Sequence, residues 1–85
     1  MTEPLVVDAR GLRCPAPVIR LARAAAGAEP GTELTVLATD PAAAHDVPAW
    51  ARMRGHAMVA ASEADGVHAL TVRITSGNDE GPAPA

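Results

Sequence analysis

The sequence predicts a small α/β domain, a two-layer sandwich in the order β-α-β-α-β-β. Two helices would cover one face of a four-stranded mixed sheet. The chain has 85 residues, which is the size of one domain with a small core. Apolar residues make up 48% of the chain and charged residues 20%, so the composition is that of a globular protein. Short β-branched runs alternate with segments of helical periodicity, and right-handed crossovers put both helices on one side of the sheet.

The first strand and helix surround the only cysteine of the chain. The apolar run at residues 5–7 predicts a buried strand. Pro15 and Pro17 then open a helix, and Cys14 takes its N-cap because Pro15 suits the first helical position. The apolar side chains that recur on one face of this helix are Val18, Leu21, Ala22 and Ala25.

A turn and a second strand follow. The Pro-Gly pair at 30–31 stops the helix, and the β-branched, mostly apolar residues 33–39 predict a strand. Asp40 comes directly before Pro41, which is a helix start: a capping carboxylate followed by proline at the first position.

The second helix contains a proline. Since Pro48 disfavours a regular helix interior, we expect a first turn from Pro41, a break or kink, and then a helix through Arg54. Asp46 offers a second cap just before Pro48. The inner stripe of the helix would be Val47, Trp50 and Ala51.

A hairpin completes the sheet. Residues 56–62 and 67–75 predict two strands, and the Asp-Gly pair at 65–66 suits the turn between them. The remaining segment, 76–85, is polar and rich in glycine and proline, which is typical of a flexible tail. We therefore expect a single domain over residues 1–75, with one sheet face left uncovered.

Composition excludes several classes of function. The net charge of −3 and the pI of about 5.4 argue against binding to a nucleic-acid backbone, and Trp50 is the only aromatic residue besides three histidines. No apolar run is long enough to span a bilayer, and the N-terminus lacks the pattern of a signal peptide, so we expect a cytoplasmic protein without membrane contact. One cysteine allows no internal disulfide or CxxC pair.

Cys14 is the candidate nucleophile. The electropositive start of a helix favours a thiolate, so this placement predicts a lowered thiol pKa. Because Pro15 and Pro17 lack an N–H, only the amides of Cys14 and Ala16 remain to receive the sulfur or an anion. Arg13 is adjacent to the sulfur in sequence and would stabilise the thiolate.

The surrounding charge is positive in the sequence. Four arginines and no acidic residue lie between Ala9 and Ala28, and they are Arg10, Arg13, Arg20 and Arg23. Such a field could steer an anionic partner. Each feature also has a plainer interpretation: a lone cysteine is usually a buried apolar residue, and an arginine cluster is usually a solvated face.

The segment from Asp8 to Pro17, DARGLRCPAP, resembles the D-x-x-G-x-x-C-P-x-P signature of the TusA/SirA-like family of small sulfur carriers. The similarity continues through the Pro-Gly pair at 30–31 and the Asp-Pro pair at 40–41. It extends through the Asp-Val-Pro element at 46–48 to the final hairpin, covering about residues 4 to 75.

The resemblance implies a sulfurtransferase whose Cys14 carries a persulfide and whose Pro15 and Pro17 shape the helix start. The implied donor is a cysteine desulfurase or a rhodanese-type protein, and the acceptor is another sulfur-relay protein. Family routes lead to tRNA thiolation, molybdenum-cofactor enzymes or sulfur oxidation. Asp40 and Asp46 match acidic positions of the pattern. The chain lacks the second cysteine that some members carry after the Asp-Val-Pro element, and arginine replaces lysine in its first helix.

The remaining polar residues are interpreted conservatively. Asp40 and Asp46 are expected first as helix caps, with a role near the thiol as the alternative, and Arg10 as a second nearby cation. His45 would be solvated rather than a base for Cys14. His56 and His68 would be edge or surface residues, whereas Trp50 would be core. We expect no metal site and no cofactor, since the histidines and acids lack metal-site spacing.

Two rival functions remain open. The first is a non-catalytic regulatory module that binds a partner through the arginine-bearing first helix and the uncovered sheet face. The second is a thiol peroxidase or redox sensor, which needs a resolving thiol from another chain.

Overall fold

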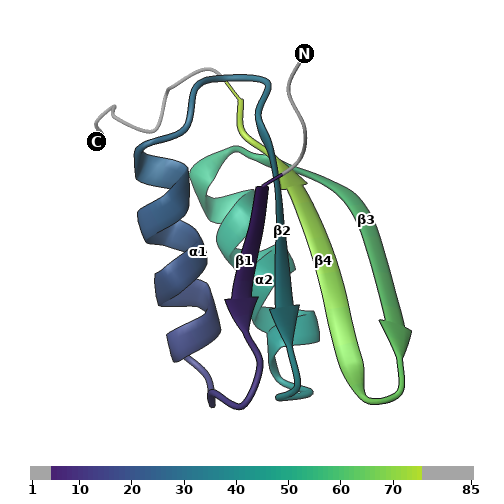
Figure 1. Ribbon diagram of the computed structural model, residues 1–85. Helices are drawn as coiled ribbons and strands as arrows, with labels where there is room; N and C mark the ends of the chain where they lie inside the picture. Colours follow the sequence, from purple (N-terminus) through teal and green to yellow (C-terminus); the bar gives the residue numbers. More distant parts are fainter. Residues whose placement is uncertain (1–4, 76–85) are drawn as a thin grey trace.

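The computed structural model describes residues 5–75, and its elements follow the predicted order (Figure 1). They are β1 (Leu5–Ala9), α1 (Ala16–Ala26), β2 (Glu33–Ala38), α2 (Ala43–Arg54), β3 (Ala57–Ala64) and β4 (Val67–Arg73). The strands form one sheet in the order β1-β2-β4-β3, with β1 and β2 parallel and the other pairs antiparallel. The predicted mixed sheet and element order are confirmed; the predicted tail at 76–85 lies outside the described residues.

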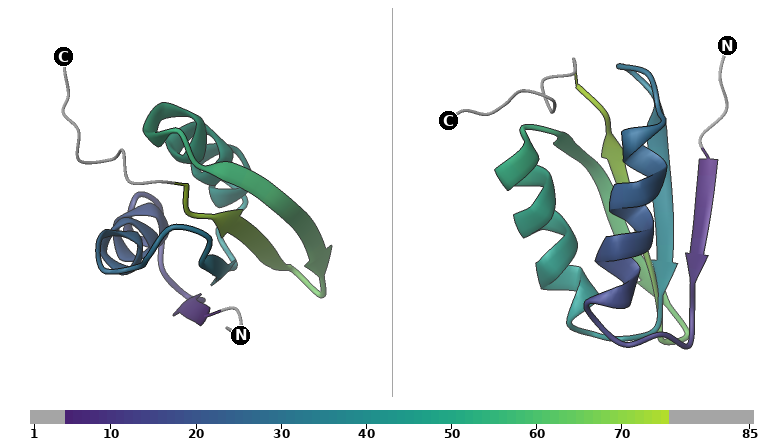
Figure 2. Two further views of the ribbon diagram at one scale, coloured as in Figure 1. Left: turned by 90° about the horizontal axis from the view of Figure 1, so that it is seen from above. Right: turned by 90° about the vertical axis from the view of Figure 1, so that its left-hand side faces the viewer.

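Both helices pack against the same face of the sheet, as the crossover rule predicts (Figure 2). Strand register decides which side chains they cover: Val7 lies beside Val36, and Val36 lies beside Leu70 on the next strand. The buried core consists almost entirely of small aliphatic side chains: Ala9, Leu21, Ala25, Leu34, Val36, Ala38, Ala43, Val47, Trp50, Ala51, Leu70, Val72 and Ile74. Small side chains let helices and sheet approach closely, which suits a chain this short.

The opposite face of the sheet has no helix over it (Figure 2). Polar pairs join neighbouring strands there. The hydroxyls of Thr35 and Thr71 are 2.7 Å apart, and Arg73 forms an ion pair with Glu33 at 3.3 Å. Cross-strand pairs of this kind stabilise a sheet that faces water on one side. The uncovered face therefore carries polar cross-strand pairs that the core lacks.

The predicted break in the second helix is wrong. α2 is continuous from Ala43 to Arg54 with Pro48 inside it, and only the turn at residues 41–42 precedes it. Proline removes one helical hydrogen bond. The burial of Val47 and Trp50 on either side of Pro48 anchors both flanks of the helix to the sheet, so the chain does not need to break.

The far end of α2 is tied to the end of β4. Gly55 ends the helix in the left-handed region, at φ 80°, which glycine adopts without strain. His56 is only 8% exposed, lies 5.2 Å from the Trp50 ring and accepts a hydrogen bond from the Thr75 amide at Nδ1. The expectation of a surface His56 is wrong, and His68 is a half-buried residue of the interior strand β4 rather than an edge residue. The prediction that Trp50 is core is confirmed.

The hairpin turn has the predicted geometry. Asp65 and Gly66 both have positive φ, 54° and 80°, as a type I′ turn requires. Within residues 5–75, neither helix is long and apolar enough to cross a bilayer.

Candidate functional site

Cys14 lies where the carboxyl ends of the parallel strands β1 and β2 meet. The loop after β1 is fastened to the loop after β2 by two hydrogen bonds. The Gly11 amide donates to Thr39 Oγ1 at 2.9 Å, and the Cys14 amide donates to Asp40 Oδ2 at 2.8 Å. Gly11 has φ 83°, a conformation that favours glycine, so it makes the bend that brings Cys14 back toward β2. The carboxyl edge of parallel strands is where α/β folds commonly place a site.

The helix start differs from the expected one by a residue. α1 begins at Ala16, Pro15 occupies the N-cap without a side-chain hydrogen bond, and Pro17 is the second helical residue. Cys14 therefore precedes the cap. The two prolines still fix the backbone that leads from the cysteine into the helix.

The two amides that were expected to face the sulfur are already bonded elsewhere. The Cys14 amide donates to Asp40, and the Ala16 amide donates to the Arg13 carbonyl at 2.9 Å. Of the two expected acceptors, the sulfur or an anion, the Cys14 amide therefore binds an anion, the Asp40 carboxylate, and the Ala16 amide binds a backbone carbonyl.

The thiol pKa moves opposite to the prediction. Partial burial, a hydrogen bond between the thiol and Asp46, and the negative charges of Asp46 and Asp40 raise the pKa of Cys14 from 9.0 to about 11. Burial and a nearby anion both disfavour a thiolate. In the isolated protein Cys14 is therefore a neutral thiol at neutral pH.

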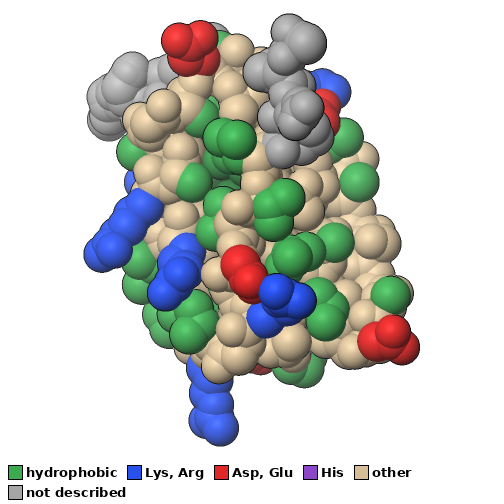
Figure 3. Space-filling model, in the orientation of Figure 1, with side chains coloured by type: hydrophobic (Ala, Val, Ile, Leu, Met, Phe, Trp, Pro, Cys, Tyr) green, Lys and Arg blue, Asp and Glu red, His purple; other side chains and the backbone are tan. Residues whose placement is uncertain are grey.

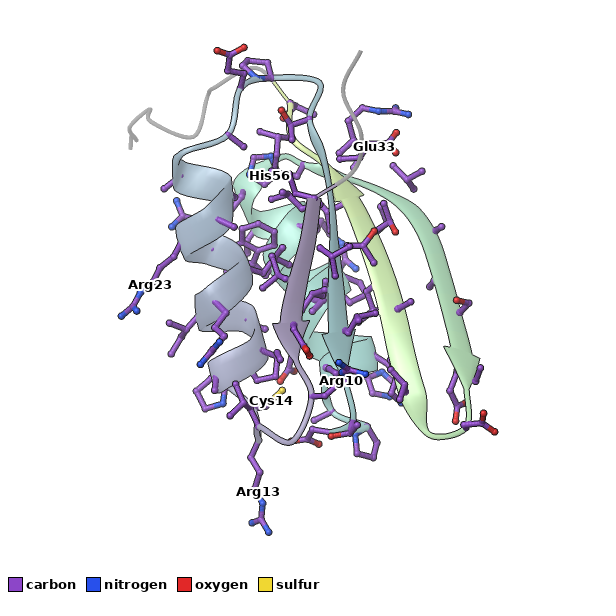
Figure 4. All side chains as sticks on the ribbon, in the orientation of Figure 1. Arg10, Arg13, Cys14, Arg23, Glu33 and His56 are labelled. Carbon is purple, nitrogen blue, oxygen red and sulfur yellow. The ribbon has the colours of Figure 1, made fainter. Side chains whose placement is uncertain are left out.

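Arg13 does not stabilise the sulfur. Its side chain is exposed and extends from the loop away from Cys14 (Figure 4). Its charge acts instead on Asp40, whose pKa is lowered first by the hydrogen bonds from the Cys14 and Ala42 amides and then by Arg13. Side chains of adjacent loop residues can point in different directions. The sequence-based prediction that the Arg13 charge lies at the Cys14 sulfur fails for this reason.

Arg10 is also committed elsewhere. Its guanidinium donates to both oxygens of Asp8, at 2.9 and 2.8 Å, in an exposed ion pair. The hydrogen bonds from Arg10 lower the pKa of Asp8 to about 2. Arg10 is thus largely neutralised by its neighbour and supplies little positive field to the thiol.

The other arginines between Ala9 and Ala28 form what we call the basic face of α1, namely Arg20 and Arg23 on the helix and Arg13 in the loop before it. All three are exposed, and none makes an ion pair within residues 5–75. Basic side chains gather along this side of the molecule in Figure 3. Ile19, whose side chain is 46% exposed on the same helix, adds an apolar group to this surface. This face begins beside Cys14, so a protein docked on it would have its surface next to the sulfur.

The two aspartates named from the sequence have different roles in the structure. Asp40 is not the N-cap of α2, which is Ala42. Its Oδ1 accepts the Ala42 amide at 3.0 Å in the turn that precedes the helix, while Oδ2 accepts the Cys14 amide. Asp46 does not cap a helix. It lies in the first turns of α2, and its carboxylate contributes to raising the pKa of the Cys14 thiol. The alternative expectation, an acid near the sulfur, therefore describes Asp46.

Other features near the site do not add a metal or a base. His45 is exposed, as expected for a solvated residue. Within the described part of the chain no cluster of three histidine, cysteine or acidic side chains could hold a metal ion. An open groove of about 430 Å³ lies between the two loops and is lined by Gly11, Leu12, Arg13, Thr39, Asp40 and Pro41. A smaller cavity, of about 150 Å³, lies by Trp50 and His56 at the other end of the helices and contains no nucleophile.

Comparison with known proteins identifies relatives along nearly the whole described chain. The family described as "Sulfurtransferase TusA" matches residues 5–74. Two putative sulfur carrier proteins of Neisseria meningitidis, from serogroups A and B, are each 46% identical over 67 residues. Each match covers 79% of this chain and 90% of the relative. The sulfur carrier protein TusA of Pseudomonas paraeruginosa is 37% identical over 75 residues, covering 86% of this chain and 95% of the relative.

A solved structure has the same fold. The SirA-like protein of Desulfitobacterium hafniense superposes with a TM-score of 0.75 at 31% identity, over 85% of this chain and 99% of its own. The resemblance read from the DARGLRCPAP segment and the β-α-β-α-β-β architecture are both confirmed.

Proposed function

Because the chain belongs to the TusA sulfurtransferase family, we propose that it is a sulfur carrier that holds sulfane sulfur as a persulfide on Cys14. The observation that supports this most is the position of Cys14. It is the only cysteine of the chain, half-buried at the carboxyl edge of β1 and β2 and fastened there through its own amide. A single fixed thiol suits the transfer of one sulfur atom at a time.

The transfer is a thiol exchange. The Cys14 sulfur, after losing its proton, attacks the outer sulfur of a donor persulfide, R–S–SH. A bond forms between the Cys14 sulfur and that outer sulfur, and the S–S bond of the donor breaks, with its electron pair leaving on the donor sulfur. The Cys14 proton ends on that donor sulfur, so the products are R–SH and Cys14–S–SH. Delivery to an acceptor thiol repeats the same exchange, and neither a metal nor an organic cofactor is needed.

The surrounding residues position the sulfur. Asp40 holds the Cys14 amide, and Pro15 and Pro17 fix the backbone that leads into α1. The carrier needs a protein donor, of the cysteine desulfurase or rhodanese type, and a protein acceptor. We propose that these partners dock on the basic face of α1, since its exposed arginines begin next to Cys14 in the chain and suit an acidic surface.

Intact mass measures loading directly. The protein is incubated with a cysteine desulfurase and cysteine, or with a rhodanese and thiosulfate. The wild type should gain the mass of one sulfur atom, and reductant should remove it. The matched control is Cys14→Ser, which changes one atom and should gain nothing. Sulfur on both proteins, or on neither with either donor, would contradict the proposal.

The exposed arginines favour one other function, a regulatory module that binds a partner without transferring sulfur. The same two variants separate the ideas. For a module, Cys14→Ser leaves partner affinity and cellular phenotype intact, whereas reversing the charges of Arg20 and Arg23 abolishes both. For a carrier, Cys14→Ser abolishes the sulfur-dependent phenotype even when the partner still binds.

A further inference from the structure

A cavity lies between α1 and α2 at the end of the molecule away from the sulfur site. Its volume is about 150 Å³. Figure 4 shows Cys14 and His56 at opposite ends of α1, and His56 is part of the cavity wall. The complete lining is Ala22, Ala25, Ala26, Trp50, Arg54 and His56. Sulfur transfer at Cys14 uses none of these residues, so a function of the cavity would be a separate one.

The side chains of the two helices explain why space remains between them. The α1 wall consists of alanines at positions 22, 25 and 26, which share one side of the helix and present only methyl groups. On α2, Trp50 and Arg54 are four residues apart, so they are neighbours on one face of that helix. The cavity is therefore apolar on its α1 side, whereas an indole ring and a guanidinium form its α2 side.

Trp50 has a hydrogen-bond donor that the protein does not use. The residue is only 8% exposed, and its indole Nε1 is buried without a hydrogen-bond partner among residues 5–75. A buried donor that lacks an acceptor destabilises the free protein, so an acceptor gains more there than at a solvated N–H. Because the nitrogen is covered, an entering oxygen must displace part of the wall. Arg54, a long exposed side chain, is the part of the wall that moves most easily.

Arg54 supplies positive charge to the cavity. It is exposed and makes no ion pair within the part of the chain that the structure describes. The helix ends nearby, which are negative, are partly satisfied. The Gly27 amide donates to the Ala24 carbonyl at 3.2 Å, and the His56 amide donates to the Ala51 carbonyl at 2.8 Å. The guanidinium therefore remains able to bind an anion, and its planar fork matches a carboxylate.

His56 forms the wall beside Trp50. The two ring centroids are 5.2 Å apart. The Thr75 amide donates a hydrogen bond to Nδ1 at 3.3 Å, so this nitrogen carries no proton and the ring is neutral. Arg54 is therefore the cation among the lining residues, and a ligand with a single negative charge matches it.

We propose that this cavity binds a short-chain carboxylate. The carboxylate would lie on Arg54 and accept the indole N–H of Trp50, and the alkyl chain would pack against the alanines of α1. A cavity of this volume holds a molecule of about the size of benzene, so the ligand has roughly two to four carbons. A tetrahedral dianion such as phosphate fits less well, because the alanine wall offers it no hydrogen bond. This inference does not depend on the proposed sulfur transfer.

The indole N–H gives a direct readout of binding, because Trp50 is the only tryptophan of the chain. The ¹⁵N-labelled full chain is titrated at neutral pH with sodium butyrate, and sodium chloride at equal ionic strength is the reference. Butyrate should move the indole proton signal downfield in a saturable way, as the N–H gains an acceptor. The dissociation constant should be on the order of 1–20 mM, as one ion pair, one hydrogen bond and a short chain allow.

Neutral and larger probes test the two parts of the ligand. Butyramide has the same chain and an acceptor oxygen but no charge, so it should bind at least about fivefold more weakly than butyrate. Sodium phosphate should give no saturable shift. An indole signal that responds equally to butyrate and butyramide, or to phosphate as strongly as to butyrate, contradicts a carboxylate site.

Two variants test the two walls of the cavity. Arg54→Gln should weaken butyrate binding at least about fivefold, whereas the matched control Arg52→Gln removes an equal charge from an exposed residue outside the lining and should change it by less than about twofold. Ala22→Leu fills the cavity from the α1 side and should weaken binding at least about tenfold. The remaining amide signals verify that each variant is folded.

Three results would overturn the inference. The first is a wild-type indole signal that moves no further with butyrate than with chloride, which needs no variant to be seen. The second is equal weakening by Arg54→Gln and Arg52→Gln. The third is a folded Ala22→Leu protein that binds butyrate as the wild type does. None of these readouts involves the Cys14 sulfur, so failure of persulfide loading and failure of butyrate binding are separate results.

Discussion

The charged residues near Cys14 differ between the two helices: those on or before α2 are acidic, and those on α1 are basic. On the α2 side, Asp40 and Asp46 are engaged with Cys14 itself, one through its amide and the other through its thiol. On the α1 side, Arg20 and Arg23 are exposed and make no ion pair within residues 5–75. The two aspartates raise the pKa of the Cys14 thiol, whereas the two arginines are exposed to an approaching partner protein.

This difference means that reactivity and recognition are set by different elements. Substitutions on the acidic side should change the chemistry of the thiol with small reagents. Substitutions on the basic side should change reactions that need a docked protein.

The largest expected effect concerns how α1 divides into a buried and an exposed side. Leu21 is fully buried on the inner side of α1, so Leu21→Ala should destabilise the fold by about 2–5 kcal/mol. Ile19, 46% exposed on the same helix, is the matched control, and Ile19→Ala should change stability by no more than about 0.5 kcal/mol. Urea unfolding followed by the fluorescence of Trp50, the only tryptophan, measures both. Equal losses would mean that the outer side of α1 is not free for docking.

Next in size is the loss of docking. The double variant Arg20→Glu with Arg23→Glu should slow sulfur loading from a protein donor at least about tenfold at low salt, because the basic face then repels an acidic surface. Its rate with neutral iodoacetamide should match the wild type. The same reversal at Arg52 and Arg54, exposed at the end of α2, serves as control and should leave loading nearly unchanged. Similar losses in both double variants would indicate a general charge effect.

A smaller change is expected from Asp40→Asn. Asparagine has one side-chain acceptor oxygen, so it cannot serve both the Cys14 and Ala42 amides, and the melting temperature should fall by a few degrees. The thiol pKa should also fall, but less than in Asp46→Asn, because Asp40 acts on the sulfur by charge and Asp46 by charge and a hydrogen bond. The pH dependence of alkylation ranks the two variants, and a larger shift in Asp40→Asn would reverse the assigned roles.

The smallest effect is predicted for Arg13, the residue next to the sulfur in sequence. Its side chain is solvated and directed away, so Arg13→Ala should alter the rate of Cys14 alkylation by no more than about twofold. Mass spectrometry at neutral pH measures that rate. A severalfold fall would show that Arg13 supports the thiolate after all.

Most of the fold could be predicted from the sequence because its signals are local. The strand at β2 is a mostly apolar run with β-branched Thr35 and Val36 at its centre. The turn at Asp65 and Gly66 has its own dipeptide signature, and the apolar face of α1 repeats at helical spacing. Pro48 misled the prediction because a local penalty was outweighed by burial on both sides of it. The packing of α2 against the sheet cannot be predicted from the presence of Pro48 alone.

The site was harder to predict for the same physical reason. Cys14 and Asp46 are 32 positions apart in the sequence, and Asp46 affects the pKa of the thiol only through the packing of the two helices, so no spacing rule could pair them. The sequence placed Arg13 with the sulfur because the two are neighbours along the chain. Side-chain direction depends on the loop, and here Gly11 and Asp40 orient the loop so that the thiol faces inward and the guanidinium faces water.

The most direct test of the acidic control of Cys14 is a titration of its thiol in the native protein. The rate of alkylation by iodoacetamide is proportional to the thiolate fraction, so it should keep rising by about tenfold per pH unit through the ordinary thiol range and level off only near the pKa of about 11. Trp50 fluorescence verifies that the protein stays folded over the same pH range. A rate that levels off at pH 9.0 or below would contradict the account, because the thiol would then behave as an ordinary or an activated one.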